Sequence, residues 1–109
     1  MSTLEDLTSA LIKFRDERDW KQFHNPKDLA IALNVEASEL LELFLWKNAS
    51  EADEQKVAEE LADVFAYALM IAHHYKLDMH EILSRKIEKN AAKYPVEKAK
   101  GTATKYSDL

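Results

Sequence analysis

Apolar side chains recur every three or four positions along most of this chain, which is the spacing of an amphipathic α-helix and not of a β-strand. We predict four helices, at about 3–18, 26–47, 51–76 and 79–94, and no sheet. The first and last helices each combine one apolar stripe with a charged opposite face. The stripes consist of Leu4, Leu7, Leu11 and Phe14 in the first helix, and of Met79, Ile82, Leu83 and Ile87 in the last.

Four helix-start signals support these limits. In each, a side-chain oxygen that can accept a free helix N–H is followed three positions later by an acid. The pairs are Thr3…Asp6, Asn25…Asp28, Ser50…Asp53 and Asp78…Glu81. Pro26 strengthens the second signal, since a first helical residue needs no N–H. Tyr94 and Pro95 end the last helix, so we predict an all-α domain over 1–95 and a polar tail over 96–109.

The two central helices are apolar almost all round, from Leu29 to Trp46 and from Leu61 to Ala72. A helix without a polar face must be covered on several sides. Four helices of this size cannot cover two such helices within one molecule. We therefore predict a four-helix bundle whose core is completed by oligomerisation.

Composition excludes several classes of protein. The chain has 109 residues, enough for one domain, and 20 acidic against 15 basic residues give a net charge of −5. An acidic balance argues against a nucleic acid polymer as partner. The polar start and the lack of an apolar run of about 20 residues predict no leader and no membrane segment. The chain contains no cysteine and one glycine, which excludes thiolate zinc sites and Gly-rich phosphate loops, and we expect a cytoplasmic protein.

Four acids interrupt the apolar faces of the central helices. Glu36 and Glu39 lie three residues apart in one helix, and Glu60 and Asp63 repeat this spacing in the next. Carboxylates that converge away from water repel one another unless they are protonated or neutralised by a positive group. The simplest such group is a divalent cation, and ligands that offer only oxygen favour Mg²⁺, with Mn²⁺ as the alternative.

Other interpretations of these acids stay open. They could face solvent or pair with Lys and Arg. A di-iron bundle is disfavoured because it uses Glu-x-x-His, and His73 and His74 do not follow an acid at that spacing. Glu42 is expected towards the polar side, as an outer group or solvated, and Glu59 is expected to be exposed.

Together with their flanks, the acidic pairs resemble the all-α nucleoside triphosphate pyrophosphohydrolases of the MazG-like superfamily, and most closely the dCTP pyrophosphatase group. The resemblance covers nearly the whole chain. The matching segments are Glu36-x-x-Glu39 and Glu60-x-x-Asp63 separated by twenty residues, Asp19-Trp20-x-Gln22-Phe23-His24, Lys86-x-x-x-Asn90, Lys93-Tyr94-Pro95 and the tail from Lys105 to Leu109.

This resemblance implies hydrolysis of a (deoxy)nucleoside triphosphate, dCTP or a related or modified deoxynucleotide, to the monophosphate and pyrophosphate, which would clear unwanted nucleotides from the pool. It implies a homodimer or a homotetramer formed as a dimer of dimers. Its catalytic Mg²⁺ ligands would be Glu36, Glu39, Glu60 and Asp63. The residues that would line the nucleotide pocket are Trp20, His24, Trp46 and Tyr67, and those that would face phosphate or sugar are Lys47, Lys86 and Asn90.

Three departures from the group bear on base choice: Val35 and Ser38 replace glycines near the first acids, and Leu11 replaces a histidine of the base pocket. A dUTPase-like or broad-specificity member of the superfamily is therefore an alternative. A non-catalytic helical protein that binds a partner through its apolar faces is another. On spacing alone, the aromatic residues could be core or interface residues, and the lysines could be solvated.

Overall fold

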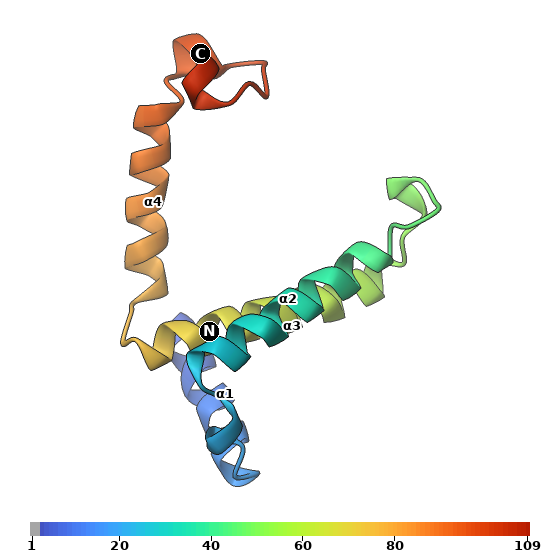
Figure 1. Ribbon diagram of the computed structural model, residues 1–109, viewed down its shortest axis with the longest axis vertical. Helices are drawn as coiled ribbons and strands as arrows, with labels where there is room; N and C mark the ends of the chain where they lie inside the picture. Colours follow the sequence, from blue (N-terminus) through green and yellow to red (C-terminus); the bar gives the residue numbers. More distant parts are fainter. Residues whose placement is uncertain (1–2) are drawn as a thin grey trace. The chain divides into compact units, whose positions relative to one another are not determined.

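The structure is a computed structural model that describes residues 3–109, and within that range every regular element is helical (Figure 1). The elements are α1 (Leu4–Glu17), the 3₁₀ helix η1 (Lys21–Phe23), α2 (Pro26–Glu42), the 3₁₀ helix η2 (Ala49–Glu51), α3 (Glu54–His74), α4 (Met79–Lys93), α5 (Val96–Ala99) and the 3₁₀ helix η3 (Tyr106–Asp108). The prediction of an all-α chain with four substantial helices is confirmed.

The chain divides into two compact units, one ending at Leu77 and the other beginning at Asp78. In the first unit, α2 and α3 lie side by side in antiparallel directions, and α1 packs against α3 (Figure 1). The buried core is small. It consists of Leu29 from α2 and Leu69, Met70 and Ala72 from α3. Burial is therefore concentrated where the first half of α2 meets the second half of α3.

Three of the four predicted helix starts are confirmed. The Thr3 hydroxyl accepts the Asp6 N–H at 3.1 Å, and the Asp6 carboxylate accepts the Thr3 N–H at 3.2 Å, which completes a capping box. The Asn25 side chain caps α2 by accepting the Asp28 N–H, and the Asp78 side chain caps α4 by accepting the Glu81 N–H.

The predicted start at Ser50 is wrong, because Ser50 lies within η2. Asp53 itself caps α3 by accepting the N–H groups of Gln55 and Lys56. An aspartate can bond the N–H groups two and three residues ahead, so a residue predicted as the acid of a start signal can serve as the cap.

The second helix ends at Glu42, earlier than the predicted limit of 47. From Leu43 to Leu45 each N–H bonds to the carbonyl three residues back, which tightens the last turn. Trp46 then adopts a left-handed conformation, with φ of 64°, and no helix can continue through it. The apolar pattern continues across this point, so the pattern alone does not locate the end.

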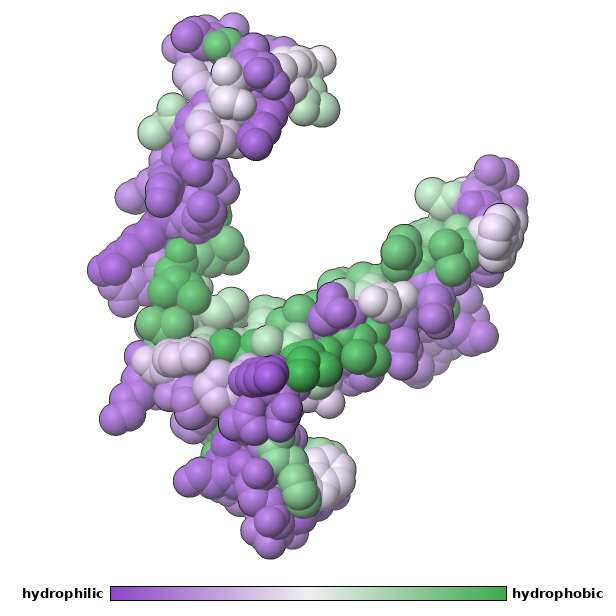
Figure 2. Space-filling view, in the orientation of Figure 1, coloured by the Kyte–Doolittle hydropathy of each residue, from purple (hydrophilic) through white to green (hydrophobic). Residues whose placement is uncertain are grey.

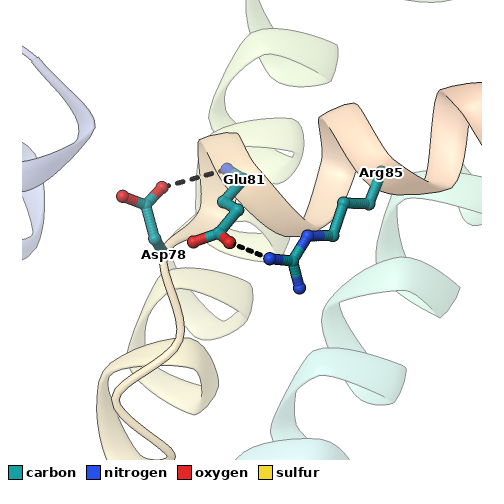
Figure 3. Close-up of polar contacts among 3 residues, drawn as sticks. All are labelled: Asp78, Glu81 and Arg85. Atoms are coloured by element: carbon teal, nitrogen blue, oxygen red, sulfur yellow. Dashed lines mark hydrogen bonds and ion pairs between the residues drawn. The ribbon is translucent and has the colours of Figure 1, made fainter.

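The second unit begins with a well-defined helix start. Asp78 accepts the Glu81 N–H, and the Glu81 carboxylate pairs with Arg85 one turn further along α4 (Figure 3). The predicted polar tail contains α5 and η3, with Gly101 in the left-handed region at φ of 80° between them. The Tyr106 ring meets the Tyr94 ring edge to face at 6.0 Å, so the last residues contact the end of α4. The domain limit at residue 95 stays a prediction.

Large apolar side chains remain exposed on several helices. On α2 and α3, Ile31, Leu41, Leu61 and Phe65 are between 41% and 61% exposed. Figure 2 shows apolar surface along the α2–α3 pair and on α4. Such surface favours association with another protein surface, as the oligomer prediction requires, and the oligomeric state stays a prediction. None of the described helices is long and apolar enough to cross a membrane.

Candidate metal centre

The pairing of α2 with α3 brings acids from both helices together. Glu36 of α2 and Glu60 and Asp63 of α3 each place a carboxylate oxygen within 4.8 Å of the other two. The sequence predicts this convergence, because the acids lie on the same faces of α2 and α3 as the apolar residues through which the two helices pack. The spacing of three between Glu60 and Asp63 puts both on neighbouring parts of one face.

Two carboxylate oxygens of this cluster lack a hydrogen-bond partner within the described residues. The Glu36 and Glu60 side chains are half-buried, and Oε2 of each is shielded from solvent without a hydrogen-bond partner. Asp63 is exposed. Among residues 3–109 the ion pairs join Arg15 with Asp16 and Glu81 with Arg85, so neither involves the cluster. Pairing with Lys or Arg, one of the alternatives for these acids, is therefore not seen in the described part of the chain.

The electrostatics of the cluster favour a bound proton or cation. The pKa of Glu36 is raised to about 7, first by the Glu39 carboxyl group, with which a protonated Glu36 can share a hydrogen bond. Burial, a similar interaction with Glu60, and the negative charges of Glu39 and Asp63 raise it further. A divalent cation would replace the proton and would supply the missing partner for the buried oxygens.

Glu39 lies beside Glu36 but outside the group of three converging oxygens, and its side chain is exposed. Glu39, the predicted fourth ligand, therefore interacts with Glu36 but is not one of the three acids whose oxygens converge. The two acids on α2 thus differ in depth, with Glu36 towards α3 and Glu39 towards solvent. Glu42 and Glu59 are exposed, as expected for outer acids.

Tyr67 of α3 lies close enough to the acidic cluster for the negative charges of Glu36 and Asp63 to affect its pKa. Its pKa is raised, first by burial and then by the negative charges of Glu36 and Asp63. The phenol therefore stays protonated and can donate a hydrogen bond near the acids. Of the residues predicted to line a nucleotide pocket, Tyr67 is the one that the structure relates to the carboxylates.

Trp20 and His24 occupy the connector between α1 and α2. The Trp20 ring meets Phe14 edge to face at 5.8 Å and is 43% exposed. His24 is half-buried, and its Nδ1 is shielded from solvent without a partner. The pKa of His24 is lowered, first by burial and then by the positive charge of Arg15. The connector therefore presents an aromatic ring and a neutral imidazole.

The remaining predicted contacts are spread over other elements. Trp46 is fully exposed in the turn after α2, so within this chain it has almost no packing partner, and Lys47 beside it is exposed too. Lys86 and Asn90 lie on α4 in the second unit, one turn apart and both exposed. Arg15 is a residue that the sequence pattern does not single out. Nothing in its spacing separates it from the exposed Arg18.

The donor set fits a hard divalent cation. All the converging groups are carboxylates, two of them have buried oxygens without partners, and hard cations bind through oxygen. The fold and this site define a class: all-α proteins with an acidic centre between paired helices. Residues 31–109 match the MazG-like family, and the chain belongs to that family.

Characterised relatives resemble the chain over almost its full length. dCTP pyrophosphatase 1 from Mus musculus is 39% identical over 98% of this chain and 68% of its own length, and the Homo sapiens protein is 36% identical with the same coverage. A solved pyrophosphatase from Archaeoglobus fulgidus is similar with a TM-score of 0.80 and 38% identity, over 87% of this chain and 94% of that one.

Proposed function

We propose that this protein is a metal-dependent pyrophosphohydrolase that converts a (deoxy)nucleoside triphosphate to the monophosphate and pyrophosphate. The observation behind it is the cluster of Glu36, Glu60 and Asp63, with two buried carboxylate oxygens that lack partners. The relatives named dCTP pyrophosphatase 1 support dCTP, or a related or modified deoxynucleotide, as the substrate. Removal of unwanted nucleotides from the pool in the cytoplasm would be the biological role.

The metal ligands in this proposal are Glu36, Glu39, Glu60 and Asp63, and the ion is Mg²⁺, with Mn²⁺ as a substitute. Bound divalent ions would neutralise phosphate charge and make a water molecule easier to deprotonate. Glu36 must give up its proton before it can act as a ligand, and the exposed Glu39 beside it would join as the fourth ligand.

The other candidate residues have roles in binding. The Tyr67 hydroxyl can donate to an oxygen near the acids. Aromatic faces of Trp20 and Trp46 can stack on a base, and neutral His24 offers one donor and one acceptor. Lys47, Lys86 and Asn90 would contact phosphate or sugar. Phosphoryl chemistry depends on such positioning and on charge neutralisation more than on a covalent nucleophile.

The exposed apolar side chains of α2 and α3 support a homodimer or a homotetramer as the working form. Leu61 and Phe65, which follow Glu60 on α3, would lie under a second copy. The acids would then be held by helices that are supported on both sides.

The decisive experiment is a panel of nucleoside triphosphates, with Mg²⁺ and with EDTA, in which pyrophosphate and orthophosphate are both measured. We expect pyrophosphate from dCTP or a modified cytosine deoxynucleotide, and none in EDTA. Glu60→Gln should abolish turnover. Glu59→Gln, which removes the same charge from the adjacent exposed position, should retain it.

The alternatives give different results in the same panel. Preference for dUTP, or similar rates for many triphosphates, would identify a dUTPase-like or a broad-specificity enzyme. Release of orthophosphate would contradict the reaction type. A folded protein that neither responds to Mg²⁺ nor cleaves any triphosphate would refute the proposal in favour of a non-catalytic interaction protein.

A further inference from the structure

Two aromatic rings at the end of α1 pack on each other and stay at the surface. Phe14, in the last turn of α1, and Trp20, in the connector, meet edge to face, with ring centroids 5.8 Å apart and ring planes at 74°. Phe14 is 47% exposed and Trp20 is 43% exposed. The contact therefore does not place the rings in the core, and it leaves apolar faces that a ligand can cover.

The backbone at the end of α1 explains why the two rings meet. Asp19 has a φ of 54°, the Asp19 N–H bonds to the Asp16 carbonyl, and the Trp20 N–H bonds to the Arg15 carbonyl, both at 3.1 Å. This is the Schellman arrangement, which turns the residue after the left-handed position back onto the helix. Any residue at position 20 could make the backbone bond. What distinguishes this chain is that the side chains brought together are two aromatic rings.

Further side-chain contacts hold this pair, and the backbone motif does not require them. The Arg18 guanidinium lies over the Phe14 ring, with Cζ 3.7 Å from the ring centroid, and its Nη1 donates to the Phe14 carbonyl at 2.9 Å. The Gln22 amide donates to the Asp19 carboxylate at 3.2 Å, which supports the left-handed residue. The Phe14 ring thus contacts a cation on its face as well as the Trp20 ring, and both contacts restrict its rotation.

Other exposed aromatic side chains lack such support. Phe23 in η1 is 61% exposed, and Trp46 is fully exposed. Within residues 3–109, no ring pair and no cation contact involves either of them. Of the two tryptophans in the chain, Trp20 is therefore the one whose ring is oriented by a neighbouring ring.

We propose that Phe14 is a positioning residue: clamped by Arg18, its ring fixes the Trp20 indole at the surface, so that a nucleobase stacks on a ring that is already oriented. This proposal rests on the proposed function for the identity of the ligand. A base that meets an ordered ring loses less freedom on binding than a base that must also order the ring. Stacking depends on the relative orientation of two rings, so an indole held in one orientation favours one mode of stacking.

An effect that acts through stacking must depend on the base. dCTP carries a base, whereas inorganic tripolyphosphate has the same chain of phosphates and no base. Loss of the Phe14 ring should therefore weaken the binding of dCTP and leave the binding of tripolyphosphate unchanged. A merely structural role, in which α1 shifts and disturbs the metal centre, would weaken both.

The first test is steady-state kinetics of the full-length protein at saturating Mg²⁺, with inorganic tripolyphosphate as a competitive inhibitor. An edge-to-face pair changes an equilibrium constant by a factor of about 2 to 10, so KM for dCTP in Phe14→Leu should rise about fivefold, with kcat little changed. Phe14→Tyr keeps the ring and should retain the wild-type KM. Arg18→Met removes the cation from the Phe14 ring and should raise KM by less than Phe14→Leu does.

The matched control is Phe23→Leu, which removes an equal ring from an exposed position of the same connector and should leave KM unchanged. A double-mutant cycle tests whether Phe14 acts through Trp20. Trp20→Leu should raise KM, and the addition of Phe14→Leu should raise it no further, because no indole is left to orient. Additive effects of these two substitutions, an equal effect of Phe23→Leu, or a rise in the Ki of tripolyphosphate equal to the rise in KM would overturn the proposal.

The second test does not need turnover. It is NMR relaxation of the two tryptophan indole N–H groups, with the Trp20 signal assigned by its loss in Trp20→Leu. The order parameter of the Trp20 indole should lie near the value of a rigid backbone, about 0.85, and should fall below about 0.6 in Phe14→Leu. Phe14→Tyr should keep it high, and the Trp46 signal should not change. An equally ordered Trp20 indole in Phe14→Leu would contradict the role of Phe14.

The two tests separate the two proposals. If the wild-type protein cleaves no triphosphate, the proposed function fails, while the relaxation data still decide whether Phe14 orders Trp20. If the enzyme is active and KM for dCTP is the same in the wild type and in Phe14→Leu, the function stands and the role of Phe14 is wrong. Circular dichroism on each variant verifies that the helices are intact.

Discussion

Glu36→Gln should stabilise the metal-free protein, because it removes one of several negative charges that crowd the cluster. The pKa of Glu36 rises from 4.5 to about 7 on folding, so the folded protein binds more protons than the unfolded chain between these pH values. Stability from Glu36 is therefore fully present below pH 4.5 and lost as pH rises through 7. Glutamine resembles the protonated form of Glu36 at every pH, so the variant loses none of this stability as the pH rises.

The magnitude follows from the same values. At about 1.4 kcal/mol per pKa unit, the difference between 4.5 and about 7 sets an upper limit of about 3 kcal/mol. Water reaches the exposed Asp63 and Glu39 and screens the repulsion, so we expect about 1 kcal/mol at pH 8. For a domain of this size that corresponds to an increase in Tm of about 4 °C or more.

The assay is thermal and urea unfolding in EDTA, at fixed protein concentration, at pH 5 and pH 8. The variant should exceed the wild type at pH 8, and the gain should be much smaller at pH 5. Glu59→Gln, at an exposed position next to Glu60, should change the free energy of unfolding by less than about 0.5 kcal/mol at either pH. A variant less stable than the wild type at pH 8, or an equal gain from Glu59→Gln, would refute the reasoning.

Three further predictions concern the metal, the surface and a helix start. Mg²⁺ affinity, measured by calorimetry, should increase from pH 6 to pH 8 with proton release near pH 7, because Glu36 must ionise to act as a ligand; an affinity independent of pH would contradict its role. Leu61→Glu should shift the protein towards smaller species in sedimentation, since it charges a 55% exposed apolar site, and an unchanged size would exclude this face from the interface. Asp53→Ala should cost about 1 kcal/mol in urea unfolding, while Ser50→Ala costs much less; the reverse order would restore Ser50 as the cap.

The limits of the helices were predictable where local interactions set them. Thr3, Asn25 and Asp78 each find their partner within three residues, so the sequence shows both members of each hydrogen bond. The end of α2 depends on the left-handed conformation of Trp46, a residue type that does not favour it. No local pattern marks such a position, and the prediction extended the helix too far.

The convergence of the acids was predictable, because the helical repeat places the acidic pairs on the same helix faces as the apolar residues. Charges on apolar helix faces must be neutralised, and Glu36, Glu60 and Asp63 meet between α2 and α3 as that argument requires. Arg15 was not predictable, since its burial depends on how α1 packs against α3 and on the course of the connector. Helix periodicity describes one element at a time and carries no information about such packing.

The acids and the exposed apolar residues of α3 lie on different sides of the helix, and both need a partner from outside the chain. Glu60 and Leu61 are adjacent, so their side chains diverge by about 100° around the helix. The first has a buried oxygen without a partner, and the second is 55% exposed. Within the described residues of a single metal-free chain, the Glu60 oxygen has no positive or hydrogen-bonding partner and the Leu61 side chain is not covered. A cation on one side and a second protein surface on the other would satisfy both, which explains why α3 is apolar nearly all round from Leu61 to Ala72 and yet contains Asp63 within that stretch. The helix can be long and ordered while its own chain buries only Leu69, Met70 and Ala72, because the rest of its surface is suited to partners.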